Sequence, residues 1–188
     1  MFVSGCDVAL AGRMKLRRFF FAGALALSTF VLAQTVTPTS SVPEVPYPDG
    51  YKRWMHITTV VSPAKNDAGV PLPEVKPATP HGLIHHVLAN ELALEGYRTG
   101  HFLEGAVLIA DWFALDENHG RLVQGARQSV DVMIRDQRYA ATGGWGFTKF
   151  DHDSHTIRQV ATHAAQSCFA CHQHAGAERE FVFSTLKP

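Results

Sequence analysis

The 188-residue sequence predicts an α+β domain, built on an antiparallel β-sheet of about five strands with two or three flanking helices. Two observations support this class. Short runs of β-branched and aromatic residues recur along the chain, without the regular alternation of strands and helices that a parallel sheet needs. The last apolar stretch instead has helical spacing, and we expect this C-terminal helix to carry the motif that indicates the function.

The first two expected strands flank a proline-rich loop. Residues 54–61 are β-branched and aromatic, and residues 83–89 form a second apolar run. Residues 62–81 between them contain five prolines and one glycine. A loop of this length inside a compact domain is more often functional or lid-like than incidental.

Three more strands are expected in the second half of the chain. Residues 106–113 are continuously apolar, which is typical of a central strand buried on both faces. After a turn at residues 116–120, residues 128–135 alternate polar and apolar side chains, as a half-buried antiparallel partner does. Beyond a break at residues 140–144, residues 145–150 place large aromatic side chains on one face of a short strand.

Two helices complete the expected fold. Asn90 is a suitable N-cap for a helix that runs to about Tyr97, and Gly100 lies just beyond its end. From Ser154 the apolar residues recur at spacings of three and four as far as Phe169. This second helix would form the C-terminal end of the domain.

The N-terminal region has the features of an export signal. A basic segment begins at Met14, which is the expected true start, and an apolar run of residues 19–32 follows it. The small residue Ala33 then precedes Gln34, so we expect cleavage after Ala33 and a signal peptide of residues 1–33. An uncleaved membrane anchor is the alternative. A cleaved chain would be periplasmic, without stable insertion in the membrane.

Cleavage leaves two segments of different composition. Residues 34–48 are rich in Thr, Ser and Pro, which is typical of a flexible linker, and residues 49–188 form one domain. Of the 17 Lys and Arg residues four lie in residues 1–33, whereas only one of the 17 Asp and Glu residues does. The exported chain is therefore mildly acidic, which argues against nucleic acid as a partner.

The C-terminal motif is Cys168-Phe169-Ala170-Cys171-His172. This Cys-x-x-Cys-His spacing is the attachment signature of c-type haem: each cysteine bonds a vinyl group of one porphyrin, and His172 is the axial ligand of the iron. A dithiol redox centre, half of a zinc site and a chance occurrence are the alternatives, but none of them explains His172. We therefore expect one covalently attached haem c and no disulfide.

Six segments together resemble the cytochrome P-460 family and its relative cytochrome c′-β. They are YPDGYKRW (47–54), IHHVLANE (84–91), GYRTGHF (96–102), DVMIRD (131–136), ATGGWGF (141–147) and CFACH (168–172). The resemblance implies an antiparallel sheet flanked by helices, a homodimer, and a five-coordinate haem c with an open distal side. It also implies a protein that binds small gaseous or nitrogen-oxide ligands such as nitric oxide.

The family resemblance leaves two branches open. Members with a lysine cross-linked to the porphyrin oxidise hydroxylamine, and members without it bind nitric oxide. Residues 106–113, where the cross-linking lysine is expected, contain no lysine, so we favour the ligand-binding branch. Lys76 and Lys149 keep the enzyme branch open, with a soluble redox partner. Electron transfer is a third possibility, although only Met55 and Met133 remain as distal methionines.

Several side chains are candidates for the surroundings of the haem. Asp111 and Phe113 are the distal candidates, Asp111 because a buried carboxylate with a raised pKa would suit proton transfer. The candidates for contacts with the porphyrin and its propionates are Arg127, Arg135, Trp145 and Phe147. Each also has an ordinary interpretation, as a solvated charge or as part of the core. The adjacent His85 and His86 should face opposite ways on their strand.

Overall fold

The computed structural model describes residues 43–65, 79–160 and 165–187, with no side-chain detail at positions 165 and 166. Contacts divide the chain into residues 1–39 and residues 40–188, and all described residues belong to the second unit. The expected signal peptide lies outside the described residues. So do most of the expected linker and the middle of the proline-rich loop, with Lys76.

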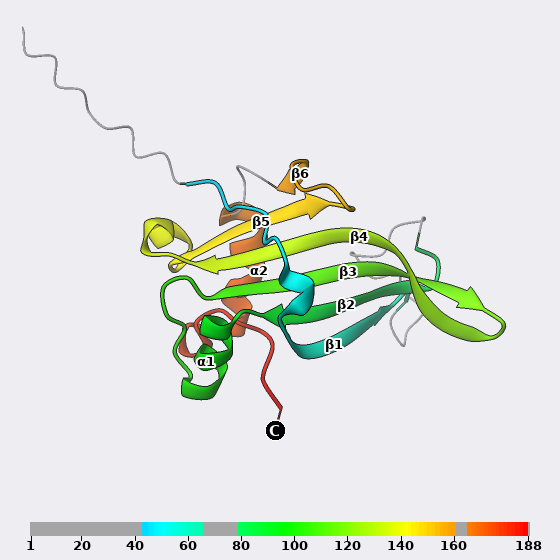
Figure 1. Ribbon diagram of the computed structural model, residues 1–188, viewed down its shortest axis with the longest axis horizontal. Helices are drawn as coiled ribbons and strands as arrows, with labels where there is room; N and C mark the ends of the chain where they lie inside the picture. The colour runs from blue at the N-terminus through cyan, green and yellow to red at the C-terminus, as the bar shows by residue number, and fades with distance from the viewer. Residues whose placement is uncertain (1–42, 66–78, 161–164, 188) are drawn as a thin grey trace, which may run out of the picture. The chain divides into compact units, whose positions relative to one another are not determined.

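In the described part of the chain, six strands form one antiparallel sheet in which neighbouring strands follow chain order (Figure 1). The strands are β1 (Met55–Pro63), β2 (Gly82–Ala89), β3 (Val107–Asn118), β4 (Arg121–Arg135), β5 (Trp145–Asp151) and β6 (Arg158–Val160). The sequence prediction of an α+β domain with an antiparallel sheet is confirmed. The sheet has one strand more than expected, at its C-terminal edge.

The described helices are short. They are η1 (Tyr51–Arg53), α1 (Glu91–Thr99), η2 (Gln137–Thr142), η3 (Ala165–Phe169), α2 (Ala170–His172), η4 (Gln173–Ala175) and η5 (Ala177–Arg179). Among the described residues, no helix has the length and apolar character needed to cross a membrane.

Helix α1 forms as its sequence predicts. The side chain of Asn90 accepts a hydrogen bond from the backbone nitrogen of Ala93 at 2.9 Å, which satisfies one free donor of the first turn. At the other end, Gly100 has φ 78°, the left-handed conformation that ends helices and favours glycine. The amide of Asn90 also donates to the carbonyl of Gly105, so the cap ties the helix to the start of β3.

Strands β3 and β4 extend farther than the apolar pattern indicates. Their pairing continues to Asn118 opposite Arg121, and the two-residue turn between them has positive φ at both His119 and Gly120. This backbone matches the twist of an antiparallel hairpin, so the pairing persists beyond the buried part of the sheet. Leu122, near the turn, is 57% exposed.

The expected helix from Ser154 is wrong over its first part. The hydroxyl of Ser154 accepts from the backbone nitrogen of Ile157, and the chain then forms β6. Val160 pairs with Lys149 on β5, and the hydroxyl of Thr148 donates to the carbonyl of Val160. Pairing with the open edge of β5 outweighs the helical spacing of the apolar residues. The motif itself is helical, from η3 into α2.

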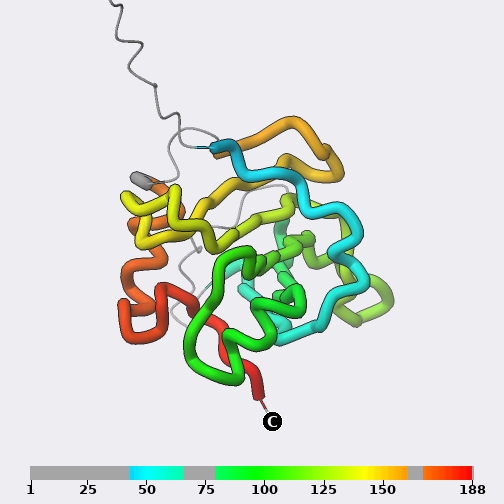
Figure 2. Tube along the Cα trace, turned by 60° about the vertical axis from the view of Figure 1, so that its left-hand side comes forward, coloured from blue at the N-terminus to red at the C-terminus, as the bar shows by residue number. Residues whose placement is uncertain are grey.

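The sheet has a buried cluster on each face. One cluster contains Val87, Leu108, Met133, Trp145 and Phe147 from the strands, and Cys168 and Phe169 pack against it. We call this side the motif face. The other cluster contains Tyr51, Ile109, Val130 and Phe150, and we call its side the opposite face. Figure 2 shows the C-terminal segment and the segment around η1 on these two sides of the strands.

The end of the expected linker belongs to the packed domain. Val45 is only 4% exposed, and its carbonyl accepts a hydrogen bond from Arg158 on β6. The ring of Tyr47 packs edge-on against Phe150 at 5.0 Å between centroids. Residues of the expected linker from Val45 onward therefore pack against the sheet.

Candidate haem site

The Cys-x-x-Cys-His motif lies on a helical stretch formed by η3 and α2. Cys168 is partly buried against the core of the motif face, whereas Cys171 is exposed. Both thiols are free, so both sulfur atoms are available for thioether bonds. Burial raises the pKa of the Cys168 thiol. One attachment point is thus in the core and the other is at its edge.

His172 is held in the orientation that an axial ligand needs. Its Nδ1 lies 2.8 Å from the backbone carbonyl oxygen of Phe181. A carbonyl can only accept, so Nδ1 carries the proton and Nε2 keeps its lone pair for a metal. The rings of Phe147 and Phe183 lie on its sides, each 5.0 Å from the imidazole.

The electrostatics of His172 agree with this geometry. Burial lowers the pKa of the imidazole, while its hydrogen bond to the carbonyl of Phe181 acts in the opposite direction. The neutral form, which is the form that binds iron, is therefore favoured. Cys168, Cys171 and His172 together fit a covalently attached haem whose iron is bound through Nε2.

The motif face also carries an ion pair that sequence reasoning missed. Asp131 on β4 pairs with Lys149 on β5, with the ammonium nitrogen 3.5 Å from the carboxylate. Burial raises the pKa of Asp131, and the charge of Lys149 partly offsets this effect. Both charges also influence the Cys168 thiol, so they lie on the side of the sheet where the haem is attached.

Buried polar atoms that lack well-formed hydrogen bonds lie around this pair. Within the described part of the chain, Asp131 Oδ1, Trp112 Nε1 and His85 Nδ1 are buried without a well-formed hydrogen bond, although Ser129 and Trp112 lie close enough to Asp131 to lower its pKa. The rings of His85 and Trp112 lie 3.9 Å apart, and the Lys149 ammonium is 6.0 Å from the Trp112 ring. Buried donors and acceptors normally find partners, so these weakly paired groups form a polar cluster on the motif face with hydrogen-bonding capacity left over.

His85 and His86 face opposite ways, as their strand position predicts. Burial lowers the pKa of His85 to about 4, which keeps its imidazole neutral. The ring of His86 is on the opposite face, where its Nδ1 lies 2.9 Å from the hydroxyl of Thr59 and its Nε2 lies 2.8 Å from the side-chain oxygen of Gln124. Only the first of the two histidines shares a face with Cys168.

Asp111 does not lie beside the motif. Its carboxylate is on the opposite face, where it accepts 2.8 and 2.7 Å hydrogen bonds from the Tyr51 hydroxyl and Arg127 Nε. Burial and the adjacent carboxylate raise the pKa of Tyr51. The expected distal role is therefore corrected: Asp111 lies three positions along β3 from Leu108 on the motif face, and because side chains alternate along a strand the two point to opposite faces.

Phe113 and Arg127 belong to the same network on the opposite face. The guanidinium of Arg127 lies 4.9 Å from the ring of Phe113 and also pairs with Asp153. Phe113 in addition contacts His86, at 5.9 Å between ring centroids. Neither residue is brought to the motif, so the expected distal role of Phe113 and the expected propionate contact of Arg127 are both replaced by structural roles.

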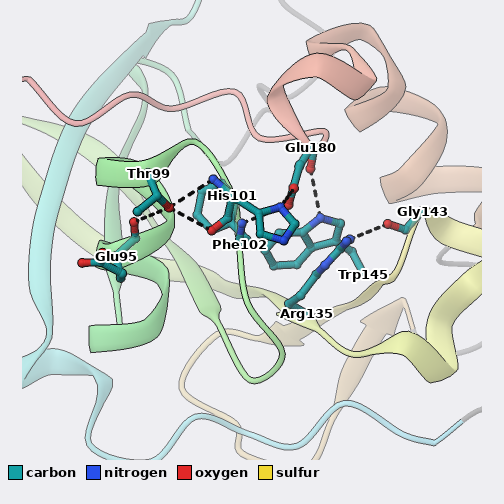
Figure 3. Close-up of polar contacts among 8 residues, drawn as sticks. All are labelled: Glu95, Thr99, His101, Phe102, Arg135, Gly143, Trp145 and Glu180. Carbon is teal, nitrogen blue, oxygen red and sulfur yellow. Dashed lines mark hydrogen bonds and ion pairs between the residues drawn. The ribbon is translucent and has the colours of Figure 1, made fainter.

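The other three candidates lie on the motif face. Phe147 contacts His172 directly, and its ring is 6.2 Å from that of Phe169. Trp145 is fully buried in the same cluster and donates to the carbonyl of Glu180 at 2.9 Å. Arg135 lies 5.5 Å from the Trp145 ring and donates to the carbonyl of Gly143, as Figure 3 shows.

The sequence did contain a signal for Asp131. It is two residues before Met133, whose side chain packs on the motif face, and the alternation of residues 128–135 assigns the two to the same side. The apolar strand at residues 106–113 drew attention to Asp111 because a carboxylate is conspicuous there. The alternation of side chains along a strand does not indicate on which face of the sheet the C-terminal helix packs.

The fold and the motif define a c-type cytochrome whose single described attachment motif lies at the C-terminal end of an antiparallel-sheet domain. A family model described as Cytochrome P460 matches residues 48–184. The chain belongs to the Cytochrome P460 family, whose members bind one c-type haem with iron. No curated protein matches the chain.

Proposed function

We propose that this protein binds nitric oxide, or a related small nitrogen-oxide ligand, at an open distal position of its haem c. The buried polar atoms of Asp131, Trp112 and His85 on the motif face carry the proposal. An iron held by His172 alone offers a vacant coordination position to a small ligand. A ligand beside this face would give those atoms a polar partner.

In this proposal, different side chains on the motif face supply hydrogen-bond donors and a charge to the ligand. Trp112 presents an indole N–H, and the Asp131 carboxyl, whose pKa burial raises, acts as a donor when it is protonated. The side-chain nitrogen of Lys149 lies 3.5 Å from the Asp131 carboxylate. Together they form a polar wall within an otherwise apolar cluster, which orients a small dipolar ligand while the aromatic residues exclude water.

Hydroxylamine oxidation with a lysine-linked haem is the second candidate, and one observation supports it. Lys149 lies on the motif face, close enough for its charge to influence Cys168. An enzyme of this kind would pass electrons to a soluble redox partner. Peptide mapping separates the candidates: a haem peptide that also contains Lys149 would establish the cross-link, and a haem peptide with only residues around Cys168 and Cys171 supports ligand binding.

Electron transfer by a haem that has two protein side chains as axial ligands is the weaker alternative. Met133 is a core residue paired with Phe147 across the β4–β5 ladder, and Met55 is 51% exposed at the start of β1. Thioethers in such positions usually fill space or face solvent. His85 is the donor that this alternative needs, because it lies on the motif face with Nδ1 free of a partner in the described structure.

The test is the coordination state of the resting holoprotein. Resonance Raman and magnetic spectra should show five-coordinate, high-spin iron, and ferrous protein should bind nitric oxide or carbon monoxide without losing a protein ligand. His85→Ala and Met133→Leu should leave the spin state unchanged. A low-spin, six-coordinate spectrum that is lost in His85→Ala or Met133→Leu would overturn the proposal and favour electron transfer.

We also propose that the protein is exported to the periplasm and forms a homodimer. The basic and apolar composition of the N-terminal segment supports export. The edge strand β1 supports the homodimer, because its exposed apolar side chains Met55, Val60 and Val61 can pack against a second copy of the chain. The mass of the periplasmic protein should match a chain that begins at Gln34 with one haem. Sedimentation should give a dimer that Val61→Lys dissociates; a monomeric wild type would contradict the homodimer.

A further inference from the structure

Two consecutive residues after η5 have an unusual backbone. Glu180 has φ 47° and Phe181 has φ 64°, although neither is glycine. Side chains with a Cβ rarely adopt this left-handed conformation, and two in succession persist only where surrounding contacts hold them. The second of these residues supplies the carbonyl that accepts from Nδ1 of His172. The strained turn therefore directly orients the proximal hydrogen bond.

The carboxylate of Glu180 is bound from the loop that follows α1. One oxygen lies 2.5 Å from Nδ1 of His101, and the other accepts from the backbone nitrogen of Phe102 at 3.1 Å. The carboxylate is 17% exposed, whereas the imidazole of His101 is 65% exposed. Figure 3 shows Glu180 between this loop and Trp145. The side chain thus joins a surface loop to the C-terminal segment.

The backbone of the turn is fixed from the other side. The indole of Trp145 donates to the carbonyl of Glu180, and the backbone nitrogen of Phe181 donates to the carbonyl of Gly176. With the carboxylate and the carbonyl of Glu180 both held, the rotation of the next peptide group is restricted. The direction of the Phe181 carbonyl toward His172 then depends on the side chain of Glu180.

We propose that Glu180 is a positioning residue for the axial ligand of the haem, acting through the carbonyl of Phe181. A well-aligned hydrogen bond at Nδ1 raises the basicity of Nε2, which strengthens its bond to iron and favours the ferric state. Loss of the carboxylate lets the turn relax and weakens that hydrogen bond. The proposal depends on haem attachment at His172 and is independent of which ligand occupies the distal side.

The experiment compares holoproteins of wild type, Glu180→Ala, Glu180→Gln and Glu178→Ala. Two quantities are measured: the iron–histidine stretching frequency of the ferrous protein, by resonance Raman, and the reduction potential. Glu180→Ala should lower the stretching frequency. It should also raise the reduction potential by about 59 mV, which for one electron increases the ferrous-to-ferric ratio about tenfold. Glu180→Gln keeps an acceptor for the Phe102 N–H and should lie nearer to wild type.

The controls separate position from charge. Glu178 is an exposed glutamate two residues away, so Glu178→Ala removes the same charge and should leave both quantities unchanged. Equal shifts in Glu180→Ala and Glu180→Gln, or in Glu178→Ala, would show an effect of charge and overturn the proposal. His101→Ala should shift both quantities in the same direction by less. If Glu180→Ala yields no holoprotein, the other two variants decide. A stretching frequency and a reduction potential equal to those of wild type in both Glu180→Gln and His101→Ala would overturn the proposal.

Discussion

Asp111 and Asp131 lie on the neighbouring strands β3 and β4, one register step apart, and their carboxylates point to opposite faces of the sheet. Asp111 is tied to Tyr51 and Arg127, whereas Asp131 is on the side of Cys168 beside Lys149. We therefore expect the two carboxylates to have separable roles, Asp111 in stability and Asp131, under the proposed function, in ligand binding.

Asp111→Asn should destabilise the holoprotein and leave ligand binding unchanged. The substitution leaves the guanidinium of Arg127, which is 11% exposed, without its principal counter-charge. Removing one partner of such a buried pair costs about 3 kcal/mol, measured as the free energy of unfolding in denaturant. Asp49→Asn is the control, because the side chain of Asp49 is 83% exposed and its loss should change little. An unchanged unfolding free energy in Asp111→Asn would refute the assigned structural role.

Asp131→Ala should speed the dissociation of nitric oxide from the ferrous protein by about tenfold. This is the kinetic equivalent of losing one hydrogen bond of about 1.4 kcal/mol to the bound ligand. Stopped-flow measurement of the dissociation rate checks it, with Asp111→Asn as the matched carboxylate control. Identical rates in Asp131→Ala and wild type would remove Asp131 from the ligand site.

The double substitution Cys168→Ala and Cys171→Ala should give a colourless protein that folds poorly. The haem contributes its binding free energy only to the folded state, so a chain that cannot retain it loses that stabilisation. Circular dichroism during thermal unfolding should show a lower midpoint or no cooperative transition. Cys6→Ala, within the expected signal peptide, should have no such effect. A stable, cooperative, haem-free double variant would count against a haem that fills the core.

Asp136 should make the stability depend on pH below about 4. Hydrogen bonds from Arg138 lower the pKa of Asp136 to about 2, compared with about 3.9 in an unfolded chain. Between these values the unfolded state binds more protons, so the stabilisation is complete above pH about 4 and is lost as the pH falls toward about 2. Unfolding free energies of the wild type should fall more steeply across this window than those of Asp136→Asn. Parallel curves would contradict the assignment.

Much of the fold could be predicted from the sequence because its signals are local. The N-cap at Asn90, the glycine beyond the helix and the alternation of residues 128–135 each specify a conformation within a few residues. The attachment motif is also local, because the spacing of Cys168, Cys171 and His172 is what allows the two cysteines to bond one porphyrin and the histidine to bind its iron. These elements and the family could therefore be recognised before any tertiary contact was known.

Other features of the fold and the site depend on partners far away in the chain. Residues 158–160 have helical spacing but form a strand, because the edge of β5 offers hydrogen bonds that local propensity cannot anticipate. The alternation on β3 and β4 separates Asp111 from Asp131, but only the docking of the C-terminal segment determines which of them shares a face with Cys168. The contact of Glu180 with His101 likewise joins residues 79 positions apart, which no local pattern encodes.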